Sequence, residues 1–279
     1  MIKLGIDIGG TTIKGGRFVN NILEKHSETP TNGNLGRKDI LKALFKVIDD
    51  LYDKDVELIG VASAGNINNQ TGECVYATDN LKGWTGINIK NEVNNRYAVE
   101  CKVENDAIAA LMAEASLLRN NNNVTMLTLG TGVGGASIVN NTIIRGNNFN
   151  GGRWGHVPLE INGIKCNCGN NGCSEQYLSA TALYKYAKKS IPDLKDCKEL
   201  FDMFRKVNND AIKILERYAQ YLNVLLKIIN NALAPESLII GGGLALSKDV
   251  LSKLIDKDIN NVIFAKLKNK AGIYGASNL

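Results

Sequence analysis

Short runs of alternating apolar residues open the chain and predict strands. Residues 3–8 alternate in this way and stop at Gly9-Gly10. Two further runs, at 13–19 and 22–29, are joined by Asn20-Asn21, a pair suited to a hairpin turn. Between residues 39 and 51 the apolar positions recur at steps of three and four, which predicts an amphipathic helix. Strands mixed with helices indicate an α/β layer structure.

The strand, glycine turn and hairpin recur after residue 120. A predicted strand at 125–129 enters Gly130-Thr131-Gly132, and strands at 134–139 and 142–145 follow. This likeness predicts two related halves with a ligand cleft between them. The other predicted elements are strands at 58–62, 98–103 and 238–240, a helix capped by Asn105 or Asp106, helical segments from 175, over 211–229 and from about 247, and a terminal helix at 271–276.

Composition narrows the class of protein. Of the 279 residues 44% are hydrophobic and 22% are charged, as in ordinary globular proteins. No apolar run approaches the ~18–20 residues that a membrane span requires, so a membrane partner is not expected. The net charge is only +5 and the basic residues are dispersed, so nucleic acid is not expected either. The N-terminus carries no secretion signal, which predicts a cytoplasmic location with reduced thiols.

Three glycine turns follow three predicted strands, at residues 9–10, 130–135 and 241–243. Glycine allows backbone N–H groups to approach a phosphate closely, and threonine hydroxyls add donors. The turns therefore predict a nucleotide phosphate site. No Gly-Lys-Ser/Thr run is present, which excludes the lysine-bearing P-loop, and the turns lack the spacing of a dinucleotide fingerprint.

A second cluster combines His156 with Cys166, Cys168 and Cys173. Three thiolates and one imidazole complete a tetrahedral zinc shell, and Gly169 and neighbouring glycines permit the sharp turns of a short loop. A closed shell of four protein ligands predicts a structural zinc ion. The remaining cysteines are expected to be core thiols.

These motifs, in this order and spacing, resemble the ROK family of sugar kinases and repressors across essentially the whole chain. The motifs are Asp7-Ile8-Gly9-Gly10-Thr11, Asn80-Leu81-Lys82-Gly83-Trp84, Glu104-Asn105-Asp106, the 130–135 turn, Gly155-His156 and the cysteine loop ending at Glu175. The resemblance implies an α/β, two-domain actin-like ATPase (RNase H-like) fold with an interdomain cleft. It assigns residues 1–104 and the C-terminal helix, about 265–279, to a small domain, and residues 105–264 with the zinc loop to a larger one.

The same resemblance implies ATP-dependent phosphorylation of a hexose, on its 6-hydroxyl, by a homodimer that uses Mg²⁺ and a structural Zn²⁺. Asp106 would be the catalytic base. The sugar would be bound by Gly65, Asn80, Asn105, Asp106, Arg153, His156 and Glu175. ATP and Mg²⁺ would be held by Asp7, Gly9, Gly10, Thr11, Lys14, Thr131, Gly132, Gly134 and Gly242. The repressors of the family carry a DNA-binding segment before the first glycine turn, and because that turn lies so close to Met1, no such segment is expected here.

Arg153 departs from the family pattern, which usually has a glutamate three residues before the zinc-binding histidine. Arginine offers donors and a fixed positive charge, so it cannot accept hydrogen bonds from sugar hydroxyls. In one interpretation the Arg153 side chain turns away from the site or pairs with Glu175, and sugar binding is weaker. In the other it selects a sugar with a different hydroxyl pattern or an anionic substituent. Ala64 is a smaller departure, since the family often has proline there.

The substrate remains open within the hexoses. Glucose is the first expectation, because it is the usual substrate of zinc-bearing relatives, and N-acetylmannosamine and fructose are alternatives. A hypothesis from another class is a non-catalytic sensor of sugar or nucleotide. The presence of both Asp7 and Asp106 argues against the sensor.

Overall fold

A computed structural model describes residues 1–279 as two compact units. The first unit comprises residues 1–117, 145–151 and 269–279, and the second comprises 118–144 and 152–268. Helix α3 (Asp106–Ala115) therefore lies in the first unit, whereas the family resemblance placed residues 105–264 together in the larger domain. It stays there because it packs on the C-terminal helix α9 (Ala271–Ser277). No helix combines the length and the apolar content needed to cross a membrane.

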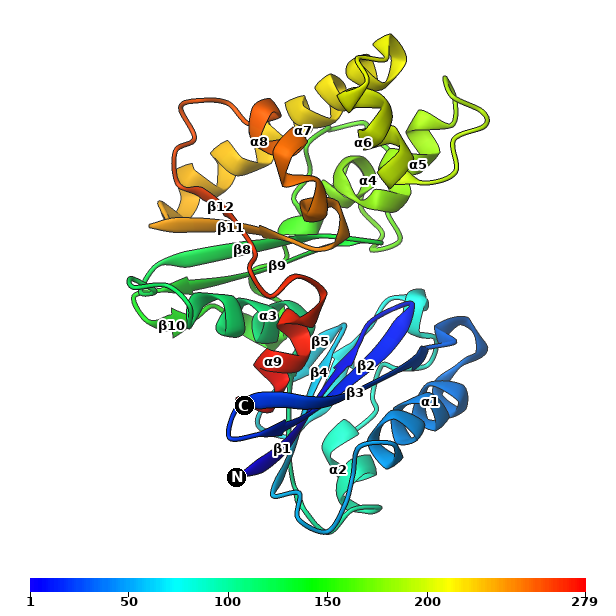
Figure 1. The fold of residues 1–279 in the computed structure, drawn as a ribbon, viewed down its shortest axis with the longest axis vertical. Helices are drawn as coiled ribbons and strands as arrows, with labels where there is room; N and C mark the ends of the chain where they lie inside the picture. The colour runs from blue at the N-terminus through cyan, green and yellow to red at the C-terminus, as the bar shows by residue number, and fades with distance from the viewer. The chain divides into compact units, whose positions relative to one another are not determined.

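The first unit is built on a five-stranded sheet with the order β3-β2-β1-β4-β7 (Figure 1). β1 pairs antiparallel with β2 and parallel with β4, which itself runs parallel to β7. The strands are β1 (Ile2–Ile8), β2 (Thr12–Val19), β3 (Ile22–Pro30), β4 (Leu58–Ser63) and β7 (Glu100–Asn105), and the small ribbon is β5 (Asn66–Asn68) with β6 (Glu73–Tyr76). The helices are α1 (Arg37–Asp49), α2 (Ile89–Asn94), α3 and α9.

The two faces of this sheet are covered differently. Leu4, Ile6 and Ile8 are fully buried in a core shared with helices α1 and α2. The intervening position Gly5 faces helix α9, because successive residues of a strand point to opposite faces. A β-carbon on Gly5 or Gly60 would overlap the backbone oxygen of Ile273 or Ala276, so both glycines let α9 lie directly on the strands.

The second unit repeats the sheet, with the order β10-β9-β8-β11-β12 and the same pattern of parallel and antiparallel pairs. The expectation of a repeated strand, glycine turn and hairpin therefore agrees with the sheet topology. Its strands are β8 (Val124–Leu129), β9 (Val133–Val139), β10 (Thr142–Ile143), β11 (Ser237–Gly241) and β12 (Val262–Phe264). Its helices are α4 (Glu175–Leu178), α5 (Ala180–Ala187), α6 (Cys197–Arg205), α7 (Asn209–Leu233) and α8 (Lys248–Leu254).

The long helix α7 holds the core of the second unit. Leu215, Leu222 and Ile229 are fully buried on one face of it, in a cluster with Leu127 and Ile240 of the sheet. Each such side chain contributes roughly 1.5–3 kcal/mol relative to leaving it in water. The packing fixes strand β8, whose end leads into the second glycine turn.

Candidate functional site

The first glycine turn connects β1 to β2 and is held by threonines. The N–H of Gly9 donates to the carbonyl of Thr12 (3.1 Å), and the buried Thr31 hydroxyl donates to the carbonyl of Gly9 (2.7 Å). Asn80 lies beside this turn, since a β-carbon on Gly10 would be 3.8 Å from that of Asn80. The residues that support the turn, Thr31 and Asn80, thus both belong to the first unit.

Asp7 stands at the end of β1, across the antiparallel ladder from Lys14. Burial and the nearby charge of Asp106 raise the pKa of Asp7 to about 7, although Lys14 opposes the shift. Helix α9 leaves room for this carboxylate only because position 272 is glycine. A β-carbon there would overlap the Asp7 side chain. Gly272 therefore belongs to the site, and no motif in the sequence pointed to it.

Asn105 and Asp106 form the junction of β7 with α3. The side chain of Asn105 accepts from the N–H of Ile108 (3.0 Å), so Asn105 is the N-cap, one of the two residues predicted for it. Its amide nitrogen donates to Asp106 Oδ1 (2.9 Å) and to the carbonyl of Gly65 (2.8 Å). These bonds fix the Asp106 carboxylate in one orientation.

The pKa of Asp106 is raised by burial, although hydrogen bonds from Ala107 N–H and the Asn105 amide lower it. Asp7 and Asp106 approach each other because β1 and β7 run in the same direction on either side of β4. Their carboxyl ends meet at one edge of the sheet, where ligands bind in open α/β sheets. A carboxylate with a raised pKa at this edge is suited to proton transfer.

The second glycine turn, between β8 and β9, is tied to Glu175. The Glu175 carboxylate accepts from the N–H of Val133 (2.9 Å), and a β-carbon on Gly132 would overlap this carboxylate. Gly242, with φ +84°, lies against the backbone of Leu129, where any side chain would be too close. The second and third glycine turns are therefore neighbours in the second unit, as a shared nucleotide site requires.

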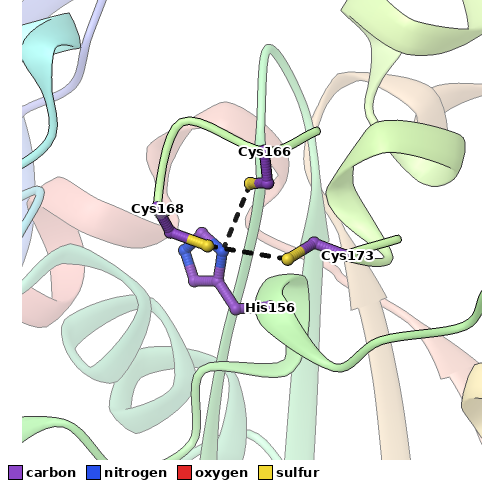
Figure 2. A group of neighbouring side chains, drawn as sticks. All are labelled: His156, Cys166, Cys168 and Cys173. Carbon is purple, nitrogen blue, oxygen red and sulfur yellow. Dashed lines mark hydrogen bonds between the residues drawn. The ribbon is translucent and has the colours of Figure 1, made fainter. Parts of the chain in front are cut away.

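Figure 2 shows the side chains of His156, Cys166, Cys168 and Cys173 converging on one point. Their ligand atoms all lie within 4.8 Å of one another. Cys166 Sγ is 3.8 Å from His156 Nδ1, and Cys168 Sγ is 3.6 Å from Cys173 Sγ. A tetrahedral zinc shell with Zn–S bonds of about 2.3 Å has ligand separations of this size. The donor set and its spacing therefore fit zinc.

Arg153 contributes its charge to the same region of the second unit. Burial, helped by the positive charge of Arg153, lowers the pKa of His156 to about 4, so the ring is neutral at pH 7, the state that binds metal. The pKa of Glu175 is raised mainly by burial, while the Val133 N–H and the Arg153 charge lower it. Arg153 thus acts electrostatically on His156 and Glu175, two of the residues expected to bind the sugar.

Comparison with known proteins gave consistent matches. A family profile described as the ROK family matches residues 3–279. A glucokinase of Streptomyces coelicolor is 30% identical, over 100% of this chain and 97% of the relative. An N-acetylmannosamine kinase of Haemophilus influenzae is also 30% identical, over 98% and 93%. A crystal structure of a ROK family glucokinase from Streptomyces griseus with glucose and AMPPNP has a TM-score of 0.87 at 26% identity, covering 100% and 98% of the two chains.

The Asp7 carboxyl predicts a pH-dependent stability. Its pKa rises from 3.8 to about 7 on folding, so the folded protein binds this proton more tightly than the unfolded chain. The free energy of unfolding therefore falls as the pH rises from about 4 to about 7. Asparagine does not titrate, so the free energy of unfolding of Asp7→Asn should not fall in this range. It should exceed that of the wild type by at most about 4 kcal/mol above pH 7 and should equal it near pH 4.

Thermal unfolding of both proteins from pH 4 to pH 8, without Mg²⁺ or nucleotide, measures this difference. Asp55→Asn is the control, because Asp55 is exposed and its variant should follow the wild type at every pH. A difference between Asp7→Asn and wild type that does not change with pH would contradict the buried, proton-binding carboxyl.

Proposed function

The chain belongs to the ROK family, and from that premise we propose that it transfers the terminal phosphoryl group of ATP to the 6-hydroxyl of a hexose. The family predicted from the motifs is confirmed. The chain is a sugar kinase with the α/β actin-like ATPase fold, as its matches to glucokinases indicate. The observation that best supports the reaction is the partly buried Asp106 carboxylate, held by Asn105 at the end of β7.

In the proposed reaction Asp106 accepts the proton of the 6-hydroxyl while the oxygen bonds to the terminal phosphorus. The bond between that phosphorus and the bridging oxygen breaks, and ADP leaves. Phosphoryl transfer has a loose transition state, so the positioning of the hydroxyl contributes more than its early deprotonation. The raised pKa of Asp106 makes it a stronger base than an exposed aspartate. Asn105, His156 and Glu175 would bind the other hydroxyls.

ATP would be bound by the three glycine turns, with Thr11 and Thr131 as additional donors and Gly242 next to the adenosine. Mg²⁺ would be held near Asp7, because carboxylate oxygen is its preferred ligand, and when bound it supplies positive charge beside the phosphates. This ion would also favour the ionised form of Asp7, whose pKa is raised in its absence. The homodimer and the cytoplasmic location expected from the sequence stay predictions.

Glucose is the proposed substrate, and N-acetylmannosamine is the second candidate. Relatives of both kinds are about equally similar to this chain. A panel of glucose, mannose, fructose, N-acetylglucosamine and N-acetylmannosamine in an assay coupled to ADP formation separates them by kcat/KM.

The role of Asp106 predicts a large loss of turnover in Asp106→Ala. General-base groups of this kind contribute about 10²–10⁴-fold to the rate, so kcat should fall by that factor on the best hexose of the panel. Asp210→Ala is the matched control, because Asp210 is an exposed aspartate in the first turn of another helix, α7, and its loss should leave kcat unchanged. Sugar binding by the wild type without any turnover would favour the sensor hypothesis instead.

The cysteine cluster predicts one structural zinc ion per chain. When bound, zinc would hold the loop of residues 156–173 in shape through His156 and the three thiolates. We expect metal analysis of protein purified without chelator to give one zinc per chain, and Cys168→Ser to lose it together with thermal stability. Cys197→Ser, which changes a partly buried thiol outside the cluster, should keep the metal. Wild-type protein without zinc would contradict this assignment.

Arg153 predicts a distinctive sugar preference. Because arginine cannot accept a hydrogen bond, Arg153→Glu should lower KM for neutral hexoses by about tenfold or more, the value of one hydrogen bond to a charged group. Arg153→Gln controls for loss of the positive charge alone. An unchanged KM in Arg153→Glu would show that the side chain does not contact the sugar.

A further inference from the structure

Residues 145–151 form a short segment that belongs to the first unit. The residues on both sides of this segment belong to the second unit, whereas the segment itself packs with the first. The N–H of Gly151 donates to the carbonyl of Arg145 (2.7 Å), which closes the segment into a loop. Side chains near its two ends then attach it to the strands that carry the proposed sugar site.

The first attachment is an ion pair between Arg145 and Glu104. Arg145 Nη2 is 2.6 Å and Nε is 3.1 Å from the same Glu104 oxygen, Oε2. The Glu104 side chain is 3% exposed and that of Arg145 is 29% exposed. A carboxylate buried to this degree requires a charged partner, and removal of that partner leaves an uncompensated charge.

The other oxygen of Glu104 reaches the catalytic junction. Glu104 Oε1 accepts from the backbone N–H of Asn105 (2.8 Å), whose side chain donates to Asp106 Oδ1 and to the carbonyl of Gly65. An unbroken series of hydrogen bonds therefore runs from the Arg145 guanidinium to the Asp106 carboxylate. Hydrogen bonds to charged groups are the stronger kind, so this series can hold the peptide between Glu104 and Asn105 in one orientation.

The second attachment lies on the other side of the same junction. Asn66 on β5 donates to Asn150 Oδ1 (3.3 Å), and Asn66 directly follows Gly65. Gly65 and Asn105 are joined by a hydrogen bond, and each is the chain neighbour of a residue that contacts the loop. Asn66 follows Gly65, and Glu104 precedes Asn105. The loop is therefore placed to hold both partners of that bond.

We propose that Arg145 is a positioning residue, which acts through Glu104 to hold Asn105 and Asp106 in the orientation that accepts the proton of the sugar hydroxyl. The inference rests on the proposed kinase reaction. It assigns the loop 145–151 a role in catalysis although none of its residues is expected to touch the sugar.

The test compares Arg145→Met with the double variant Glu104→Gln/Arg145→Met. Loss of the guanidinium should lower kcat by roughly 10- to 100-fold, because small displacements of a catalytic group have effects of that size, while KM for ATP stays unchanged. In the double variant the buried charge is gone, and the amide oxygen that replaces the carboxylate can still accept from the Asn105 N–H. The kcat of the double variant should therefore lie within about threefold of that of Glu104→Gln alone. Arg145→Met would then have a large effect only when Glu104 is present, as expected for two residues in direct contact.

Hydrogen exchange supplies a readout that does not depend on activity. The amides of Asn105 and Ile108 should exchange faster in Arg145→Met than in the wild type, and the double variant should restore their protection. Arg205→Met is the matched control, because Arg205 also forms a two-point ion pair, with Asp249, but on an exposed surface of the second unit. It should change neither kcat nor these amides.

A folded Arg145→Met with wild-type kcat and wild-type exchange would overturn the proposal, as would a loss of kcat that Glu104→Gln does not relieve. These results differ from a failure of the proposed function, in which the wild-type protein phosphorylates none of the hexoses. In that case hydrogen exchange still shows whether Arg145 orders the junction of β7 with α3. Unchanged exchange of the Asn105 and Ile108 amides in Arg145→Met would refute that role.

Discussion

The site in the first unit depends on how closely helix α9 lies against the sheet. Glycines at positions 5 and 60 bring the helix backbone onto β1 and β4, and Gly275 does the same toward helix α3, where a β-carbon would overlap the carbonyl of Ala109. Contacts of this kind are intolerant of even one added methyl group, because protein interiors are already close-packed. The seven-residue C-terminal helix thereby packs on β1, which carries Asp7, on β4, and on α3, which begins at Asp106.

This packing also explains the electrostatics. Burial raises the pKa of both carboxyls above that of an exposed aspartate, and at Asp7, which α9 partly covers, the charge of Asp106 raises the pKa further. The arrangement is unfavourable for the free protein. In the proposed reaction a divalent cation near Asp7 and a sugar hydroxyl at Asp106 would offset this cost, which would link a loss of folding stability to a gain in catalysis.

Local patterns predicted the elements and motifs whose signals are contained in a few consecutive residues. The hairpin at Asn20-Asn21, the cap at Asn105 and the four members of the cysteine cluster are of this kind. The short ribbon of β5 and β6 and the helix α2 were missed, because three- to six-residue elements show no clear period. The roles of Gly272 and of the Arg145–Glu104 pair depend on contacts between distant segments, and strand alternation in β7 would place Glu104 on the face of the exposed Glu100 and Lys102.

A hexose kinase of this kind converts ATP and a hexose to ADP and a sugar phosphate. Phosphorus NMR of the purified protein with Mg²⁺, ATP and each hexose measures this conversion directly, because ADP, inorganic phosphate and a sugar phosphate have separate resonances. We predict a phosphomonoester resonance, split by the two protons on carbon 6, that grows in step with ADP. Release of inorganic phosphate alone, or no change in ATP with any hexose, would contradict the assignment of the protein as a hexose kinase.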